Sequence, residues 1–178
     1  GSWLILEGIG RSILNAEGRR CVIVNSRDAT ERKRVVDALA QRSLQQQVIA
    51  EFGEFALRQY EVQSVMDKAV QRIAQTLHTK YCKVLELQPG GTSFLLRAGV
   101  GWHDGLVGRA TVSAGLESHA GYTLSLNEPV IVENLETDRR FSGPPLLFDH
   151  GVISGLSVII RGEREPWGVL GVHTSARR

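Results

Sequence analysis

The clearest hydrophobic pattern in the chain is a pair of apolar segments near its C-terminal end. Residues 151–160 and 168–173 are rich in Val, Ile and Leu, as β-strands are, and the charged segment 161–166 separates them. The apolar side chains are Val152, Leu156, Val158, Ile160, Val169 and Val172. They supply more apolar surface than one face of a hairpin can hide. We therefore expect an antiparallel hairpin in the middle of a sheet.

A pattern with helical periodicity precedes this hairpin. Between residues 61 and 77, apolar side chains recur at intervals of three and four, which predicts an amphipathic helix packed on a sheet. These side chains are Val62, Val65, Met66, Ala69, Val70, Ile73 and Leu77. Strands are predicted at 81–88 and 93–100, around a Pro-Gly-Gly-Thr turn. The remaining predicted elements are a glycine-rich loop, a helix at 117–126, a short strand at 129–132 and an irregular lid at 136–148.

The N-terminal part of the chain begins with a second predicted hairpin. Residues 3–14 and 19–26 have the composition of strands, and residues 15–18 form a turn that contains glycine. Asp28 and Glu31 have the spacing of a capping box, in which Asp28 is the N-cap and Glu31 reaches back to it. Helix-forming residues without proline then continue, which predicts one long helix over residues 31–56.

The apolar residues of this long helix suggest a seam. They are Val35, Leu39, Leu44, Val48, Phe52 and Phe55. Their spacings of four and three suit a coiled coil, although the step from Leu39 to Leu44 breaks the heptad. We expect a parallel homodimer through residues 31–56. The alternative is a single amphipathic helix packed on its own domain.

Composition narrows the class of protein. The chain has 178 residues, of which 42% are hydrophobic and 22% charged, as in a folded domain that carries an additional arm. Its net charge of +2 and scattered basic residues argue against a nucleic-acid partner. Cys21 and Cys82 lie far apart in predicted strands, as buried thiols of a cytoplasmic protein would. No apolar run approaches the ~20 residues of a membrane span, so we expect a cytoplasmic location without direct membrane contact.

Three segments of the C-terminal part resemble a known family. His150–Val158 (HGVISGLSV) and Trp167–His173 (WGVLGVH) resemble the last two sheet strands of GAF domains, and Asn127–Asn134 (NEPVIVEN) also fits the pattern. GAF domains are small-molecule-sensing modules of bacterial signalling proteins. The resemblance extends back to about Leu44 and implies an α+β fold, an antiparallel sheet flanked by helices. Family members usually end with one more helix, so we interpret residues 57–178 as a GAF domain lacking its last helix.

The N-terminal hairpin, together with Asp28–Lys33 (DATERK), resembles the C-terminal end of a PAS domain. In that family the residues corresponding to Asp28 and Arg32 commonly form a salt bridge. The resemblance implies that residues 1–30 are the last strands of a PAS domain and that residues 31–56 are a signalling helix. Two such strands alone would leave their apolar side chains exposed, so we expect the hairpin to need a partner surface.

The sequence contains no recognisable catalytic constellation. It has no G-x-S-x-G motif, and its five histidines lack the HxxxH or HExxH spacing of zinc sites. Two cysteines also exclude the cysteine trio of GAF-like reductases. We therefore expect neither a metal nor a catalytic residue in this chain. A different hypothesis, a stand-alone enzyme, would use His119 or His150 as a general base.

The GAF resemblance also suggests particular ligands, which the residues argue against. A thioether-linked bilin needs a cysteine in or near the lid, and residues 139–150 contain none. The spaced Asn-Lys-Phe-Asp-Glu set of cyclic-nucleotide-binding members has no counterpart that we can place. Haem would need an axial histidine, for which His119 or His150 could serve. We expect no cofactor.

Two interpretations remain for the GAF-like part: a small-molecule pocket between the sheet and the lid, or a packed dimerisation module without a ligand. The candidate pocket residues are Trp102, Arg109, His119, Tyr122, Phe141 and His150.

The combined resemblance implies a function in signal transduction. A PAS–GAF tandem commonly precedes the catalytic region of a two-component sensor histidine kinase, so we interpret the chain as the regulatory region of such a kinase. A diguanylate cyclase or phosphodiesterase uses the same inputs and is the alternative. The residues at hand contain neither output.

Overall fold

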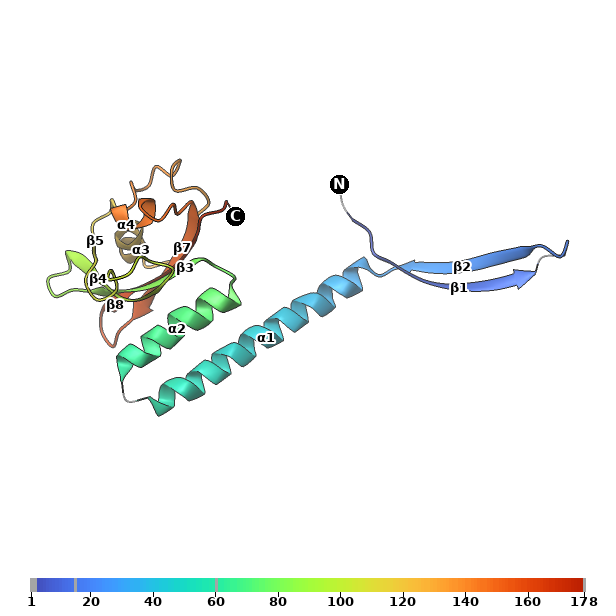
Figure 1. The fold of residues 1–178 in the computed structure, drawn as a ribbon, viewed down its shortest axis with the longest axis horizontal. Helices are drawn as coiled ribbons and strands as arrows, with labels where there is room; N and C mark the ends of the chain where they lie inside the picture. The colour runs from blue at the N-terminus through green and yellow to red at the C-terminus, as the bar shows by residue number, and fades with distance from the viewer. Residues whose placement is uncertain (1–2, 15, 60, 178) are drawn as a thin grey trace. The chain divides into compact units, whose positions relative to one another are not determined.

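The computed structural model describes residues 3–14, 16–59 and 61–177, and it divides the chain into two compact units, Gly1–Glu54 and Phe55–Arg178. The first unit contains a two-stranded hairpin and most of a long helix, and the second contains a six-stranded sheet with its helices (Figure 1). Throughout the described ranges, every helix is too short or too polar to cross a lipid bilayer.

The first unit begins with strands β1 (Leu6–Leu14) and β2 (Arg20–Asp28). They pair antiparallel in a continuous register from Leu6 opposite Asp28 to Leu14 opposite Arg20. The predicted hairpin is thus confirmed, apart from its turn residue Asn15, which lies outside the described residues. Apolar side chains such as Ile9 and Val24 are 80% and 64% exposed. Neither face of the hairpin is therefore buried by the described residues of the first unit.

Helix α1 (Thr30–Arg58) begins close to the predicted position, but its first turn is held differently. The Asp28 carboxylate accepts a hydrogen bond from the Thr30 backbone N–H at 2.8 Å, whereas no described contact supplies the reciprocal bond expected from Glu31. Arg32 forms its ion pair with Glu7 at 2.6 Å, so the Asp28–Arg32 salt bridge that the PAS resemblance implies is wrong for this chain. Glu7 also binds Arg27, and this arrangement ties both strands to the helix.

The described part of α1 contains no buried residue. Leu39 and Leu44 are 62% and 58% exposed. Because a helix turns about 100° per residue, the five-residue step between them moves the apolar stripe to another side of the helix. Leu44, Val48, Phe52 and Phe55 then share one side. Of these four residues Leu44 is exposed, whereas Val48, Phe52 and Phe55 are half-buried.

The second unit is a single antiparallel sheet with strand order β5-β4-β3-β8-β7-β6. Its strands are β3 (Tyr81–Leu87), β4 (Ser93–Val100), β5 (Thr111–Ser113), β6 (Val130–Val132), β7 (Ser154–Arg161) and β8 (Pro166–Thr174). The sequence did not predict β5, and β7 begins at Ser154 rather than at Gly151. Strand β8 lies between β3 and β7, so the C-terminal hairpin does occupy the interior of the sheet, as predicted.

Helix α2 (Val62–Thr76) covers one face of this sheet, and α3 (His119–Leu126) and α4 (Pro145–Phe148) lie on the other (Figure 1). On the α2 side the hydrophobic core consists of Met66, Val70, Ala74, Cys82, Val84 and Ala98. The side that carries α3, α4 and the irregular segment 133–149, here called the lid side, has a second apolar core that includes Leu85, Leu147 and Val169. The α+β architecture of an antiparallel sheet flanked by helices is confirmed.

Candidate functional site

Polar side chains are buried mainly on the lid side of the sheet. The buried polar residues are Lys83, Ser118, His119, Thr123, His150, Ser154, Ser157 and His173. The α2 core, by contrast, consists of apolar side chains. A domain that needed only stability would have two apolar cores, because burying a polar group costs free energy unless the group is hydrogen-bonded. The lid side is therefore the candidate functional site.

The structure brings five of the six predicted pocket residues to this side, in two aromatic groups. Trp102 and His150 pack edge to face with ring centroids 5.0 Å apart. His119 stacks on Phe141 at 5.0 Å, and Tyr122 contacts the same ring at 5.5 Å. Arg109 does not join them, because it lies exposed in the turn before β5. His173 links the groups, since its ring centroid lies 6.1 Å from that of Trp102 and 5.6 Å from that of His119.

The His150 ring is held in place by hydrogen bonds to the backbone. Its Nδ1 lies 2.8 Å from the Leu146 carbonyl oxygen, to which it donates, and its Nε2 accepts from the His103 backbone N–H at 2.9 Å. The Tyr81 hydroxyl donates to the His150 carbonyl at 2.7 Å. Because both ring nitrogens are engaged and the tautomer is fixed, His150 has no nitrogen left for a general base or an axial haem ligand. Its role is to tie α4 to the loop after β4.

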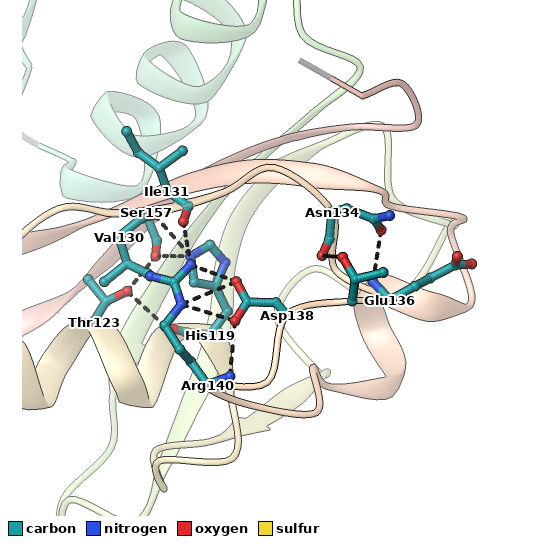
Figure 2. Close-up of polar contacts among 10 residues, drawn as sticks. His119, Thr123, Val130, Ile131, Asn134, Glu136, Asp138, Arg140 and Ser157 are labelled. Carbon is teal, nitrogen blue, oxygen red and sulfur yellow. Dashed lines mark hydrogen bonds and ion pairs between the residues drawn. The ribbon is translucent and has the colours of Figure 1, made fainter.

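His119 lies at the start of α3, where the Ser118 side chain caps the helix by accepting from Gly121 N–H at 2.9 Å. The His119 Nε2 lies 3.1 Å from the Val130 carbonyl and 2.8 Å from Ser157 Oγ (Figure 2). A carbonyl only accepts, so Nε2 carries the hydrogen. The Ser157 hydroxyl is then free to donate to Thr123 Oγ1, which itself donates to the His119 carbonyl at 2.8 Å. Every donor in this network has an acceptor.

An ion pair closes the lid beside this network. Arg140 donates to both carboxylate oxygens of Asp138 and, at 2.6 Å, to the Ile131 carbonyl on β6 (Figure 2). Its guanidinium carbon also lies 5.6 Å from the centre of the Phe141 ring. The pair holds the pKa of Asp138 below its usual value, mainly through the hydrogen bonds from Arg140. Arg140 thereby fastens the lid to the edge of the sheet and covers the aromatic stack.

Lys83 and His173 complete the site, and both were missed as site residues from the sequence. Lys83 on β3 is 2% exposed and His173 on β8 is 1% exposed. In the sheet register, Lys83 pairs with Gly99 on β4 and with Gly171 on β8, and His173 pairs with Gly155 on β7. Because these glycines have no side chain, neighbouring side chains lie directly over the sheet at these positions. A Cβ on Gly99 would lie 2.5 Å from the Trp102 ring, and one on Gly155 would lie 2.2 Å from His173 Nδ1.

Burial dominates the electrostatics of these bases. It lowers the pKa of Lys83 to about 7 and that of His119 to about 4. Burial also lowers the pKa of His173 well below its ordinary value, and Lys83 and His119 lower it further. Both histidines are therefore neutral at pH 7. Burial raises the pKa of the neighbouring Cys82 thiol to about 12, so this thiol is not a nucleophile.

The described residues contain no group of three or more His, Cys, Asp or Glu side chains that could hold a metal ion. They do contain a concentration of nitrogen bases with no carboxylate among the buried polar residues. The arrangement can therefore donate hydrogen bonds and positive charge toward a ligand.

Comparison with known proteins agrees with this architecture. A family model described as the GAF domain matches residues 61–178. The GAF domain of an Acinetobacter phosphoenolpyruvate-protein phosphotransferase is 21% identical with a TM-score of 0.63, over 78% of this chain and 79% of that one. A free methionine-R-sulfoxide reductase from Neisseria meningitidis, in complex with its substrate, is 10% identical with a TM-score of 0.64, over 76% and 75%.

A third similar structure is a GAF domain of a phosphoenolpyruvate-protein phosphotransferase from Coxiella burnetii, 16% identical with a TM-score of 0.65 over 74% of this chain and 79% of that one. No curated protein matches the chain. At these identities the solved structures show the shared fold alone.

Proposed function

The chain belongs to the GAF domain family, and on this premise we propose that it is the sensory and regulatory region of a signalling protein whose GAF unit receives a small ligand beneath the lid. One observation carries the proposal: most of the buried bases and hydroxyl groups lie on the lid side of the sheet, whereas the core beneath α2 is built from apolar side chains. Stability alone does not require that asymmetry.

The test of ligand binding is a thermal-unfolding screen of the whole chain against small molecules of positive, negative and zero charge. A ligand that binds only the folded state raises the melting temperature with its concentration. At least one compound should do so in a saturable manner. If no compound does, the alternative function, a dimerisation module without a ligand, is the better account.

The upstream part of the proposal concerns residues 1–56. We infer that the β1–β2 hairpin is the end of a PAS domain and that α1 is a signalling helix. The exposed apolar faces of the hairpin support this inference, because an isolated two-stranded hairpin is marginally stable and needs a surface to lie against. The domain division at residues 30 and 56 remains part of the same proposal.

We propose a cytoplasmic two-component sensor histidine kinase as the parent protein, because such kinases commonly combine PAS and GAF inputs in this order. The coding sequence that follows residue 178 distinguishes the possible outputs. A dimerisation and phosphoacceptor helix supports the kinase. A Gly-Gly-Asp/Glu-Glu-Phe run supports a diguanylate cyclase instead, and a stop codon contradicts both.

A signalling helix of this kind should form a parallel homodimer. Leu44 is 58% exposed, and it shares one side of α1 with Val48. Each large apolar side chain that is buried against a second copy contributes on the order of 1.5–3 kcal/mol. We expect the wild-type chain to sediment as a dimer at tens of micromolar and the double variant Leu44→Glu/Val48→Glu to sediment as a monomer.

The control for the dimer is Ser43→Glu/Gln46→Glu, which adds the same charge on the other side of the helix. We place the seam at the stripe of Leu44, Val48, Phe52 and Phe55, and Ser43 and Gln46 do not share that side of α1, so this variant should remain dimeric. A wild-type monomer, or equal weakening by both double variants, would show that α1 is not a dimer seam.

A further inference from the structure

Two buried basic side chains on the lid side, Lys83 and His173, both lie beside Gly171, and neither has an acidic partner among the described residues. The position that a Cβ on Gly171 would take lies 2.8 Å from His173 Nε2 and 3.1 Å from Lys83 Cε. Among the described residues, His173 Nε2 has no hydrogen-bond partner. The described contact of the Lys83 ammonium is with the Trp102 ring, whose centroid lies 5.4 Å from Nζ.

The carboxylates of this unit are engaged elsewhere or exposed. Asp138 is held by Arg140 at 2.6 Å, and Glu86, which projects from the α2 face of β3, is paired with Arg97 at 2.7 Å. Asp104 and Asp149 are exposed. Buried ammonium groups are nearly always paired, because an unpaired buried charge is costly. The residues that the structure describes thus provide no countercharge for the buried Lys83 side chain.

We propose that Lys83 and His173 together bind a small anion, a carboxylate or an inorganic oxyanion, which supplies the missing countercharge. This inference rests on the proposed function and specifies the chemical class of its ligand. The Lys83 ammonium donates up to three hydrogen bonds, and a His173 Nε2–H donates one, so an oxygen anion between them satisfies both groups.

The surroundings favour a ligand with few heavy atoms. Gly171 and Gly155 form the floor, and the rings of Trp102 and His119 stand edge-on to His173. Lys83 and His173 are almost completely enclosed, so a ligand reaches them only when neighbouring residues move, and we place this movement in the lid segment 133–149. Binding is thereby coupled to the lid, which Arg140 fastens to β6.

The experiment measures calorimetric binding and thermal stabilisation of the whole chain by formate, acetate, nitrate and phosphate. Chloride at equal ionic strength is the reference, and acetamide is the uncharged counterpart of acetate. We expect at least one anion to bind and acetamide not to bind. The strongest anion then distinguishes a carboxylate from an inorganic oxyanion.

Lys83→Met removes the charge at similar volume, and Lys80→Met is its control on the exposed neighbouring lysine. We expect Lys83→Met to weaken anion binding about tenfold or more, as the loss of a charge-assisted hydrogen bond does, and Lys80→Met to change it less than about twofold. Equal weakening by both variants would indicate non-specific charge attraction and overturn the proposal.

A measurement on the wild-type chain keeps the proposal testable if Lys83→Met fails to fold. The side-chain nitrogen signal of Lys83 should move to that of a protonated, hydrogen-bonded ammonium when the anion is added, and acetamide should leave it unchanged. If none of the anions binds, the proposal is wrong. If an uncharged or cationic compound from the screen binds with equal affinity to wild type and Lys83→Met, this inference fails although the proposed function stands.

Discussion

Replacing Lys83 by methionine should raise the free energy of unfolding by about 4 kcal/mol near pH 7 in a buffer that contains only chloride as its anion. Burial lowers the pKa of Lys83 from 10.5 in the unfolded chain to about 7 in the folded protein. The folded protein therefore either keeps the proton at a cost in free energy or releases it, whereas the unfolded chain keeps it at no such cost. Methionine has a similar length and no charge, so the variant avoids this cost.

The sign of the pH dependence follows from the protons bound. Between pH 7 and 10.5, the unfolded chain holds more protons at residue 83 than the folded protein does, so the contribution of Lys83 to wild-type stability rises with pH across this window. The advantage of Lys83→Met should be fully present below about pH 7 and shrink toward the lysine's unfolded pKa. The pKa of the Cys82 thiol is raised mainly by burial, which both proteins share, but the charge of Lys83 lowers it and is lost in the variant.

Urea unfolding followed by tryptophan fluorescence at several pH values measures this difference. Lys80→Met is again the control, because the exposed ammonium of Lys80 keeps its hydration in the folded protein. A stability difference between Lys83→Met and wild type that does not change with pH would mean that Lys83 is not buried as described.

Gly168→Ala should destabilise the GAF unit by about 3 kcal/mol or more, because overpacking in the interior of a sheet forces the backbone apart. Gly168 lies on β8 opposite Glu86 of β3. An alanine Cβ at this position would lie 2.0 Å from the Leu85 carbonyl oxygen, an atom that cannot move without disturbing the two central strands.

Gly53→Ala is the matched control for Gly168→Ala. Gly53 lies within α1, and an added Cβ would meet nothing within 4 Å. Alanine is favoured over glycine in a helix by roughly 1 kcal/mol, so this change should stabilise α1. Thermal unfolding followed by circular dichroism compares the two variants. Similar small effects from both would contradict the close approach of β8 to β3.

The sequence predicted those parts of the fold that depend on local periodicity. Helix α2 and strands β3, β4 and β8 have clear patterns of apolar residues, because each contributes a whole row of side chains to a core. Strand β5 was missed because it has only three residues, Thr111–Ser113, of which only Val112 is buried. So short an element depends on its pairing with β4 rather than on its own composition.

The candidate site was harder to predict, because its members come from different strands. Lys83 alternates with Tyr81 and Leu85, and this period of two was a signal that the lysine faces the core. The sequence could not show that Gly171 would lie beside it, since this depends on the register between β3 and β8. Trp102, His119 and His150 were identified from residue type, but the hydrogen bonds of His150 give it a structural role.

The Asp28–Arg32 salt bridge was implied by the family resemblance, and the structure contradicts it. Family resemblance supplied a partner by position in the motif, whereas the register of β1 and β2 places Glu7 opposite Arg27. Glu7 is then close enough to take Arg32 as well, with its carboxylate oxygens shared between the two guanidinium groups. Long-range pairing across the hairpin thus determined the ion pair.

Hydrogen–deuterium exchange of the whole chain, with and without the compound that stabilises it most, tests most directly whether the lid side receives a ligand. The amides to follow are those that hold the lid, such as Leu135 bonded to the Ile153 carbonyl and Val152 bonded to the Leu147 carbonyl. The account predicts slower exchange at these amides and in α3 when the compound is bound, with no change in the β1–β2 hairpin. Slower exchange confined to the hairpin or to α2, with the lid amides unaffected, would contradict it.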